Sequence, residues 1–157
     1  FRQNGSNFIY SCTTTWYGLD NGSNNYYFNN SSFSNNSNEK KNVKEGKRFG
    51  DVGNAIQRYV ESQGFNVVRD LCGHGIGKEL HEDPLIFNYG KRGTGPQIKK
   101  GMVFCIEPMV SMGSSEIKKS DDNFSFKTKD NSLSAHFEHM IAVTKRGPEI
   151  LTIPACA

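Results

Sequence analysis

The chain has 157 residues, of which 35% are hydrophobic and 22% are charged, and its formal net charge is +3. This length suits a single domain. The net positive charge is small, and direct binding of nucleic acid would call for Lys and Arg clustered on one face, so we expect no nucleic-acid partner. No apolar run is long enough to span a bilayer and no secretory signal is visible, so we expect no membrane partner. The four cysteines form no C-x-x-C pair, which favours reduced, intracellular thiols over disulfides or a cysteine zinc site.

Residues 1–42 form a separate compositional block that is rich in Asn and Ser. A stretch of this kind cannot bury enough apolar surface to offset the entropy lost when it becomes ordered. We therefore expect this block to be disordered or an inserted loop. The folded part of the chain is expected to cover residues 43–157.

The first regular element predicted after this boundary is a helix over residues 50–63. Asp51 near its start suits the positive end of the helix dipole, and Gly64 just past its end suits a C-terminal cap. Apolar residues recur with helical spacing and indicate an amphipathic helix: Val52, Ala55, Ile56, Tyr59 and Val60.

Short strands are predicted along the rest of the chain. The apolar run 102–106 indicates a buried strand, and it ends at Glu107-Pro108 because proline cannot continue a central ladder. One helix with several mostly antiparallel strands predicts an α+β fold. The predicted strands cover residues 65–68, 102–106, 124–128 and 134–144, with a polar, loop-like segment at 111–122.

Three residues are of the types that metal sites use. His74 lies between Gly73 and Gly75, which leave space around its ring and permit unusual backbone angles. Glu107 ends one predicted apolar strand, and Glu138 lies inside another. A buried carboxylate must be paired, hydrogen-bonded or bound to a metal. One imidazole with two carboxylates forms a ligand set that suits Mn, Fe, Co or Zn.

Each of these residues also has an ordinary alternative role. His74 can be a satisfied turn histidine, Glu107 the partner of a nearby lysine, and Glu138 a charge on an edge strand. From the residues alone, these roles and a metal site both stay open. The chain contains no G-x-S-x-G, no H-E-x-x-H and no Gly-rich phosphate loop that would indicate another chemistry.

From about residue 43 to residue 153 the chain resembles type I methionine aminopeptidases. Two of the matching strings, Lys-Thr-Lys-Asp and Ser-Leu-Ser-Ala, are typical of the methionine-specific branch. The resemblance implies the C-terminal half of the pita-bread (creatinase/aminopeptidase) fold, a mostly antiparallel sheet with flanking helices, and makes residues 43–157 part of a peptidase M24-type catalytic domain. The matching strings cover residues 53–57, 72–77, 81–84, 101–104, 106–109, 127–130, 132–135 and 137–139.

The resemblance implies that His74, Glu107 and Glu138 are metal ligands. Glu107 matches a ligand that also serves as general base toward water at the site, and Glu138 matches the carboxylate that bridges two metals. The implied cofactors are two divalent metal ions, which are Co, Mn, Fe or Zn.

The resemblance also implies residues that handle the substrate. His81 matches a catalytic, substrate-binding histidine that hydrogen-bonds the scissile peptide and helps to stabilise the tetrahedral intermediate. Leu80 and Phe124 fall where the family lines its pocket for the methionine side chain. A larger aromatic residue is common at the position of Phe124, so the shape of the pocket is expected to differ.

The implied reaction is hydrolytic removal of the initiator methionine from nascent polypeptides when the next residue is small. The substrate would be met near the ribosome. We therefore expect a cytoplasmic protein, with an organelle such as a plastid or a mitochondrion as the alternative.

The first half of the family's fold supplies two further aspartate ligands, and upstream of Val43 this sequence offers Asp20 alone. We expect the chain to be a fragment of a longer protein. Two alternatives stay open: the first half comes from another chain, or the chain is a non-catalytic pita-bread binding module or an inactive truncated relative. The presence of His74, Glu107 and Glu138 together favours an enzyme lineage.

Overall fold

The computed structural model describes residues 8–10, 16–19, 25–28 and 42–152. The disorder predicted for residues 1–42 falls mostly on residues outside these ranges, and for those residues it stays a prediction. The described part of the block consists of three short strands: β1 (Phe8–Tyr10), β2 (Trp16–Leu19) and β3 (Asn25–Phe28).

Helix α3 spans Phe49–Ser62, which confirms the predicted helix to within one residue at each end. The Asp51 carboxylate accepts a hydrogen bond from the backbone N–H of Arg48 at 3.0 Å. This bond, followed by one from the backbone N–H of Gly93, holds the pKa of Asp51 below its usual value. Gly64 follows the helix with a φ of 81°, a left-handed conformation that favours glycine at this position.

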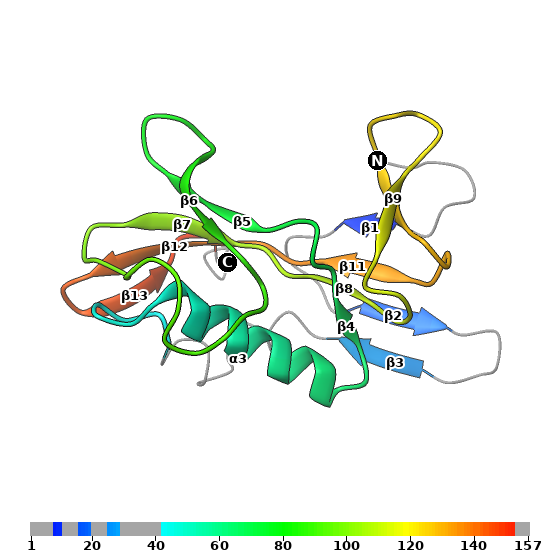
Figure 1. The fold of residues 1–157 in the computed structure, drawn as a ribbon, viewed down its shortest axis with the longest axis horizontal. Coiled ribbons are helices and arrows are strands. Elements are labelled where there is room, and N and C mark those ends of the chain that lie inside the picture. The colour runs from blue at the N-terminus through cyan, green and yellow to red at the C-terminus, as the bar shows by residue number, and fades with distance from the viewer. Residues whose placement is uncertain (1–7, 11–15, 20–24, 29–41, 153–157) are drawn as a thin grey trace, which may run out of the picture.

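A five-stranded antiparallel sheet faces α3 (Figure 1). The β7 strand lies at its centre, between β5 and β12. In sheet order the strands are β13 (Gly147–Ile150), β12 (His139–Thr144), β7 (Val103–Ile106), β5 (Gly73–Ile76) and β6 (Glu82–Ile86).

The hydrophobic core lies between this sheet and α3. The Phe104 side chain of β7 is 1% exposed, and its ring meets that of Phe49 edge-on, with 5.0 Å between the ring centroids. The helix contributes the buried side chains of Val52, Ile56 and Val60. Burial of this apolar surface is the main force that holds the helix to the sheet.

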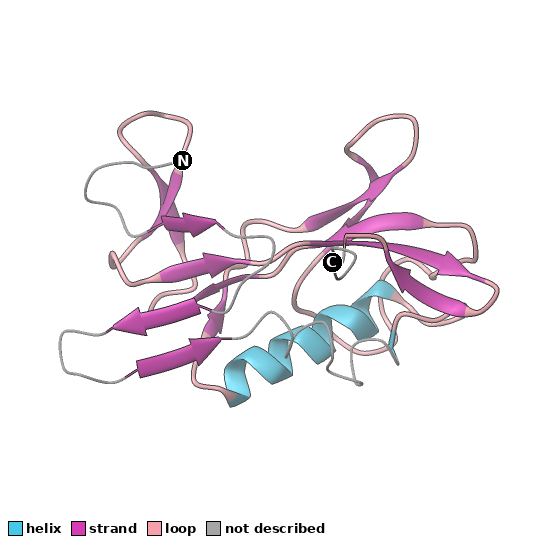
Figure 2. Ribbon diagram, turned by 180° about the vertical axis from the view of Figure 1, so that it is seen from behind, coloured by secondary structure: helices cyan, strands magenta, loops and turns pink. Residues whose placement is uncertain are grey.

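A second sheet continues the fold at the other end of the molecule, as the rear view shows (Figure 2). It contains β4 (Asn66–Val67), β8 (Met109–Ser111) and β11 (Ser134–His136), with β1 added in parallel to β11. Two separate pairs complete the strands: β2 with β3, and β9 (Ile117–Lys119) with β10 (Phe126–Thr128).

Two predictions about strands are wrong. Residues 134–144 do not form one strand, because the chain leaves the second sheet after His136 and enters the five-stranded sheet at His139. Phe137, at this crossing, is buried, and its backbone N–H bonds to the carbonyl of Pro108 at 3.1 Å. The segment 111–122 is not purely loop, since it contains β9, which pairs with β10.

The α+β class is confirmed. The resemblance implied more than one flanking helix. Within the described ranges α3 is the only complete helix. Among these same residues, no helix has both the length and the apolar character that crossing a membrane requires.

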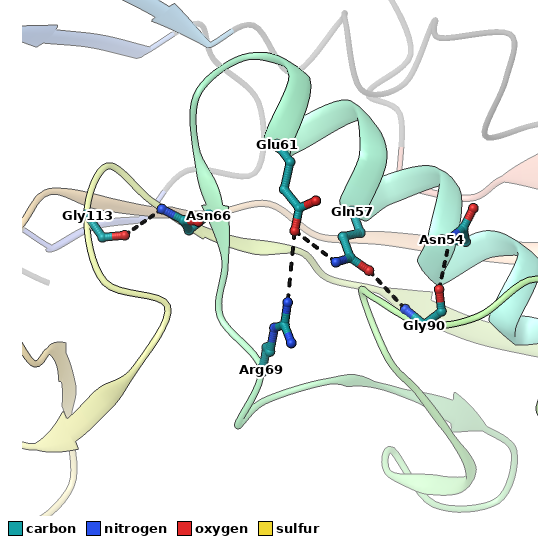
Figure 3. Close-up of polar contacts among 7 residues, drawn as sticks. All are labelled: Asn54, Gln57, Glu61, Asn66, Arg69, Gly90 and Gly113. Atoms are coloured by element: carbon teal, nitrogen blue, oxygen red, sulfur yellow. Dashed lines mark hydrogen bonds and ion pairs between the residues drawn. The ribbon is translucent and has the colours of Figure 1, made fainter.

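Polar contacts fasten the segment between β6 and β7 to α3 (Figure 3). The Asn54 side-chain amide donates to the carbonyl of Gly90 at 2.9 Å, and the N–H of Gly90 donates to Gln57 Oε1 at 3.3 Å. The helix approaches this segment at Gly53, where an added Cβ would stand 2.5 Å from the carbonyl oxygens of Phe87 and Tyr89. This region therefore tolerates no larger residue at Gly53 without moving the backbone.

Asp130 organises the turn that leads into β11. Its carboxylate accepts hydrogen bonds from the Ser114 N–H at 2.6 Å, the Ser132 N–H at 3.1 Å and the Ser132 hydroxyl at 2.7 Å. These bonds, with that of Ser114 the strongest cause, lower the pKa of Asp130 from 3.8 to about 2. The ionised carboxylate is thus the form that the folded chain prefers.

We predict that Asp130→Asn lowers thermal stability at neutral pH, and that this deficit disappears in acid. Because the folded-state pKa is depressed, the stabilisation is fully present above pH 3.8 and is lost as the pH falls through about 2. Melting curves of both proteins across this window test the prediction, with Asp121→Asn as the control at a fully exposed side chain. A deficit that stays constant with pH would refute it.

Candidate metal centre

The two predicted glutamate ligands lie where the chain crosses between the two sheets. Glu107 separates β7 from β8, and Glu138 immediately precedes β12. Because β7 and β12 are antiparallel, with His139 opposite Ile106, these crossings lie side by side. Glu138 is therefore not inside a strand, as the sequence predicted, but at a junction next to the junction that holds Glu107.

Alternation along β7 divides its side chains between two faces. Phe104 and Ile106 belong to the core against α3. Cys105 and Glu107 therefore project to the opposite side, which we call the site face. The Cys105 residue is only 3% exposed and the Glu107 side chain 14% exposed, so both are largely removed from water.

His74 is a buried residue of β5, next to β7 in the sheet. Its neighbouring glycines are needed for close approach of strands, because a Cβ on Gly73 would collide with the carbonyl of Cys105 and one on Gly75 with that of Asp83. Neither glycine has a positive φ, so the unusual backbone angles that the sequence permits are not used here. The glycines instead bring the His74 strand tightly against both neighbours.

The ring of His74 is oriented by its own strand. Its Nδ1 lies 3.0 Å from the carbonyl oxygen of Gly75, a contact in which Nδ1–H is the donor. In a neutral ring this leaves Nε2 with a lone pair, and Nε2 lies 3.4 Å from Glu107 Oε1. Two acceptors face each other stably only when a proton or a cation lies between them. This arrangement fits a metal ligand whose second ring nitrogen is held by a backbone carbonyl.

The third predicted ligand joins the same group. Donor atoms of His74, Cys105 and Glu138 all lie within 4.8 Å of one another. The structure thus brings the three predicted ligands together, since His74 contacts Glu107 and lies near Glu138. Two of the ordinary alternative roles do not match the structure. Glu107 contacts a histidine rather than a lysine, and His74 lies in a strand rather than in a turn.

Sequence reasoning missed two residues at this centre. His136 of β11 places its Nε2 3.2 Å from Glu107 Oε2, so that Glu107 lies between two imidazoles. Cys105 contributes its thiol to the group described above. Both lie outside the matching strings, and the available signal was their spacing of two residues from Glu138 and Glu107, respectively.

The predicted substrate residues differ in their positions relative to this centre. The His81 ring lies beside that of His74, with 4.2 Å between their centroids. Phe124, 87% exposed, borders a cavity of about 120 Å³ whose lining also includes His136. Leu80 is 63% exposed and does not line this cavity. Their roles in binding substrate stay predictions.

We predict that Gly75→Ala lowers the free energy of unfolding by about 3 kcal/mol, because the new methyl group collides with rigid backbone of β6. The strand that carries His74 would have to move. Gly77→Ala is the matched control, since the added methyl group meets only the flexible Glu82 carboxylate. Urea denaturation of both variants tests this prediction, and equal stability would contradict it.

An imidazole and two carboxylates that lie together beside an α+β sheet form a donor set typical of a metal-binding domain. The chain belongs to metallopeptidase family M24, whose model matches residues 35–145. Membership of this family implies divalent metal ions as cofactors. His74, Glu107 and Glu138 offer nitrogen and oxygen donors that suit such ions.

Known relatives agree with this family. Over 106 residues the chain is 53% identical to the methionine aminopeptidase of Clostridium perfringens. The aligned segment covers 68% of this chain and 43% of that protein. It is 51% identical over 111 residues to that of Escherichia coli K12, covering 71% of this chain and 42% of that protein.

A solved methionine aminopeptidase from Thermotoga maritima matches with a TM-score of 0.70 and 45% identity, over 82% of this chain and 55% of that one. This likeness confirms the predicted pita-bread fold. The chain spans less than half the length of the two curated relatives.

Proposed function

We propose that this chain is the metal-binding C-terminal part of a methionine aminopeptidase that removes the N-terminal methionine from nascent polypeptides. The observation that carries the proposal is the contact of 3.4 Å between His74 Nε2 and Glu107 Oε1, in a group that also brings Glu138 close to His74. The sequence identity of 53% and 51% to two methionine aminopeptidases supports polypeptides with an N-terminal methionine as the class of substrate.

In this proposal, His74, Glu107 and Glu138 hold two divalent ions, which are Co, Mn, Fe or Zn, together with two aspartates from outside residues 42–152. Such ions make bound water a nucleophile at neutral pH and polarise a carbonyl group. The His74 ring, anchored by Gly75, keeps its Nε2 directed at the site. The position of Glu138 at a crossing between sheets fixes it beside His74.

Glu107 would also act as general base. It accepts a proton from the attacking water and later transfers it to the departing amine. Its Oε2 lies near His136 Nε2 and its Oε1 near His74 Nε2, so the carboxylate lies between two imidazoles. Its backbone carbonyl accepts a hydrogen bond from the buried Asn88 side chain at 3.1 Å, which fixes the junction itself.

His81, beside His74, would donate a hydrogen bond to the scissile peptide and stabilise the oxyanion that forms there. Phe124 and Leu80 would contact the methionine side chain, whose flexible thioether suits an apolar, irregular surface. We also propose that the substrate is met near the ribosome, in the cytoplasm or in an organelle.

A chimaera tests this function. The 111-residue matching segment of the Escherichia coli enzyme is replaced by its counterpart from this chain, so that the remaining ligands come from the bacterial protein. We expect methionine release from the peptide Met-Ala-Ser with added Mn²⁺ or Co²⁺, and no release when the chimaera carries Glu107→Ala. A folded chimaera that binds metal without releasing methionine would overturn the proposal and favour a non-catalytic module.

A further inference from the structure

The thiol of Cys105 is the one donor at the centre for which the proposed function has no use. Cys105 lies in the middle strand of the five-stranded sheet, opposite Met140 of β12. The hydrophobic core cluster includes its neighbours Phe104 and Ile106 but not Cys105. A buried cysteine often serves as a small apolar residue, yet this one projects away from the apolar core, onto the site face.

The dimensions of the group fit a single ion. The donor atoms of Cys105, His74 and Glu138 lie within 4.8 Å of one another. Donors around one tetrahedral ion lie roughly 3–4 Å apart, because each stands about 2.0–2.3 Å from the metal. Binding of one ion would therefore require the three donor atoms to approach one another from separations of up to 4.8 Å.

We propose that Cys105 is a metal ligand, and that with His74 and Glu138 it forms a nitrogen, sulfur and oxygen donor set for one ion. The thiol binds as a thiolate and releases its proton to the solvent. This inference rests on the proposed function for the ligand roles of His74 and Glu138. It goes further by adding a soft donor to an otherwise hard set.

A thiolate changes which metal the site prefers. Oxygen and nitrogen donors alone suit Mn²⁺, whereas thiolates select Zn²⁺ and other softer ions. We therefore expect this centre to prefer Zn²⁺ and Co²⁺ over Mn²⁺. Cys105→Ser is expected to narrow the preference for Zn²⁺ over Mn²⁺ by about tenfold or more.

Cobalt spectroscopy of this chain tests the proposal. Co²⁺ bound to a thiolate has a charge-transfer band in the near ultraviolet, which is absent when all donors are oxygen and nitrogen. The band is expected in the unmodified chain, is expected to be lost in Cys105→Ser, and is expected to persist in Cys72→Ser. Cys72 is the matched control, because it lies beside the centre on the segment leading to β5 but is not part of the donor group.

Three outcomes would overturn the proposal. These are bound Co²⁺ with no thiolate band, a band that survives Cys105→Ser, and no binding of Co²⁺. If Cys105→Ser does not fold, Cys105→Ala is compared with the unmodified chain instead. Absence of the thiolate band in the unmodified chain would overturn the proposal without any variant.

The same measurements separate this proposal from the proposed function. An active chimaera without the band would leave the proposed function standing and overturn the role of Cys105. An inactive chimaera with the band would remove that function and keep Cys105 as a ligand.

Discussion

Replacing Glu107 with alanine is expected to weaken binding of Zn²⁺ or Co²⁺ to this chain by about 100-fold or more. Loss of a residue that only supports a metal ligand already weakens binding by about 10–100-fold, and Glu107 is proposed as a ligand itself. Its two carboxylate oxygens lie 3.4 Å from His74 Nε2 and 3.2 Å from His136 Nε2. The variant therefore removes negative charge from the middle of the centre.

Titration calorimetry measures this loss directly, and thermal unfolding provides a second readout. An ion at 100 times its Kd stabilises a folded protein by about 2.7 kcal/mol, and a hundredfold weaker affinity removes most of this gain. Glu45→Ala is the control, because Glu45 is an exposed carboxylate on the turn before α3. Equal affinities for all three proteins would show that Glu107 is not a ligand.

Phe104→Ala is expected to lower the free energy of unfolding by about 3–5 kcal/mol. Phe104 is 1% exposed and packs edge-on against Phe49, so the variant leaves a cavity between the central strand and α3. A domain of ordinary stability has only about 5–15 kcal/mol in total. The site would be affected as well, since Cys105 and Glu107 follow on the same stretch of chain.

Urea denaturation compares this variant with Phe124→Ala, the same chemical change at a side chain that is 87% exposed. The control is expected to change stability by no more than about 0.5 kcal/mol. A small effect at Phe104, similar to that at Phe124, would contradict the assignment of the core.

The sequence predicted α3 well because the information for a helix is local. Val52, Ile56 and Val60 recur with helical spacing, and Asp51 and Gly64 mark its two ends within a few residues of the stripe. The split between β11 and β12 could not be predicted in this way. The run from 134 to 144 is apolar enough for one strand, and only pairing with distant β7 and β8 shows where the chain changes sheets.

The candidate ligands were predicted for two different reasons. His74, Glu107 and Glu138 stood out because such residues are unusual beside glycines or in apolar runs, and the family resemblance then gave them roles. For His136 and Cys105 the local signal was weaker, a spacing of two residues from Glu138 and Glu107, respectively. They reach the centre through the registers of β11 and β7, which sequence spacing alone does not reveal.

An anomalous diffraction measurement tests the central claim most directly. Crystals of this chain grown with Zn²⁺ would be measured at the zinc absorption edge. The account predicts a peak on the site face, about 2.0–2.2 Å from His74 Nε2 and from carboxylate oxygens of Glu107 and Glu138. Zinc bound only elsewhere, with these three side chains contacting one another and no ion, would contradict it.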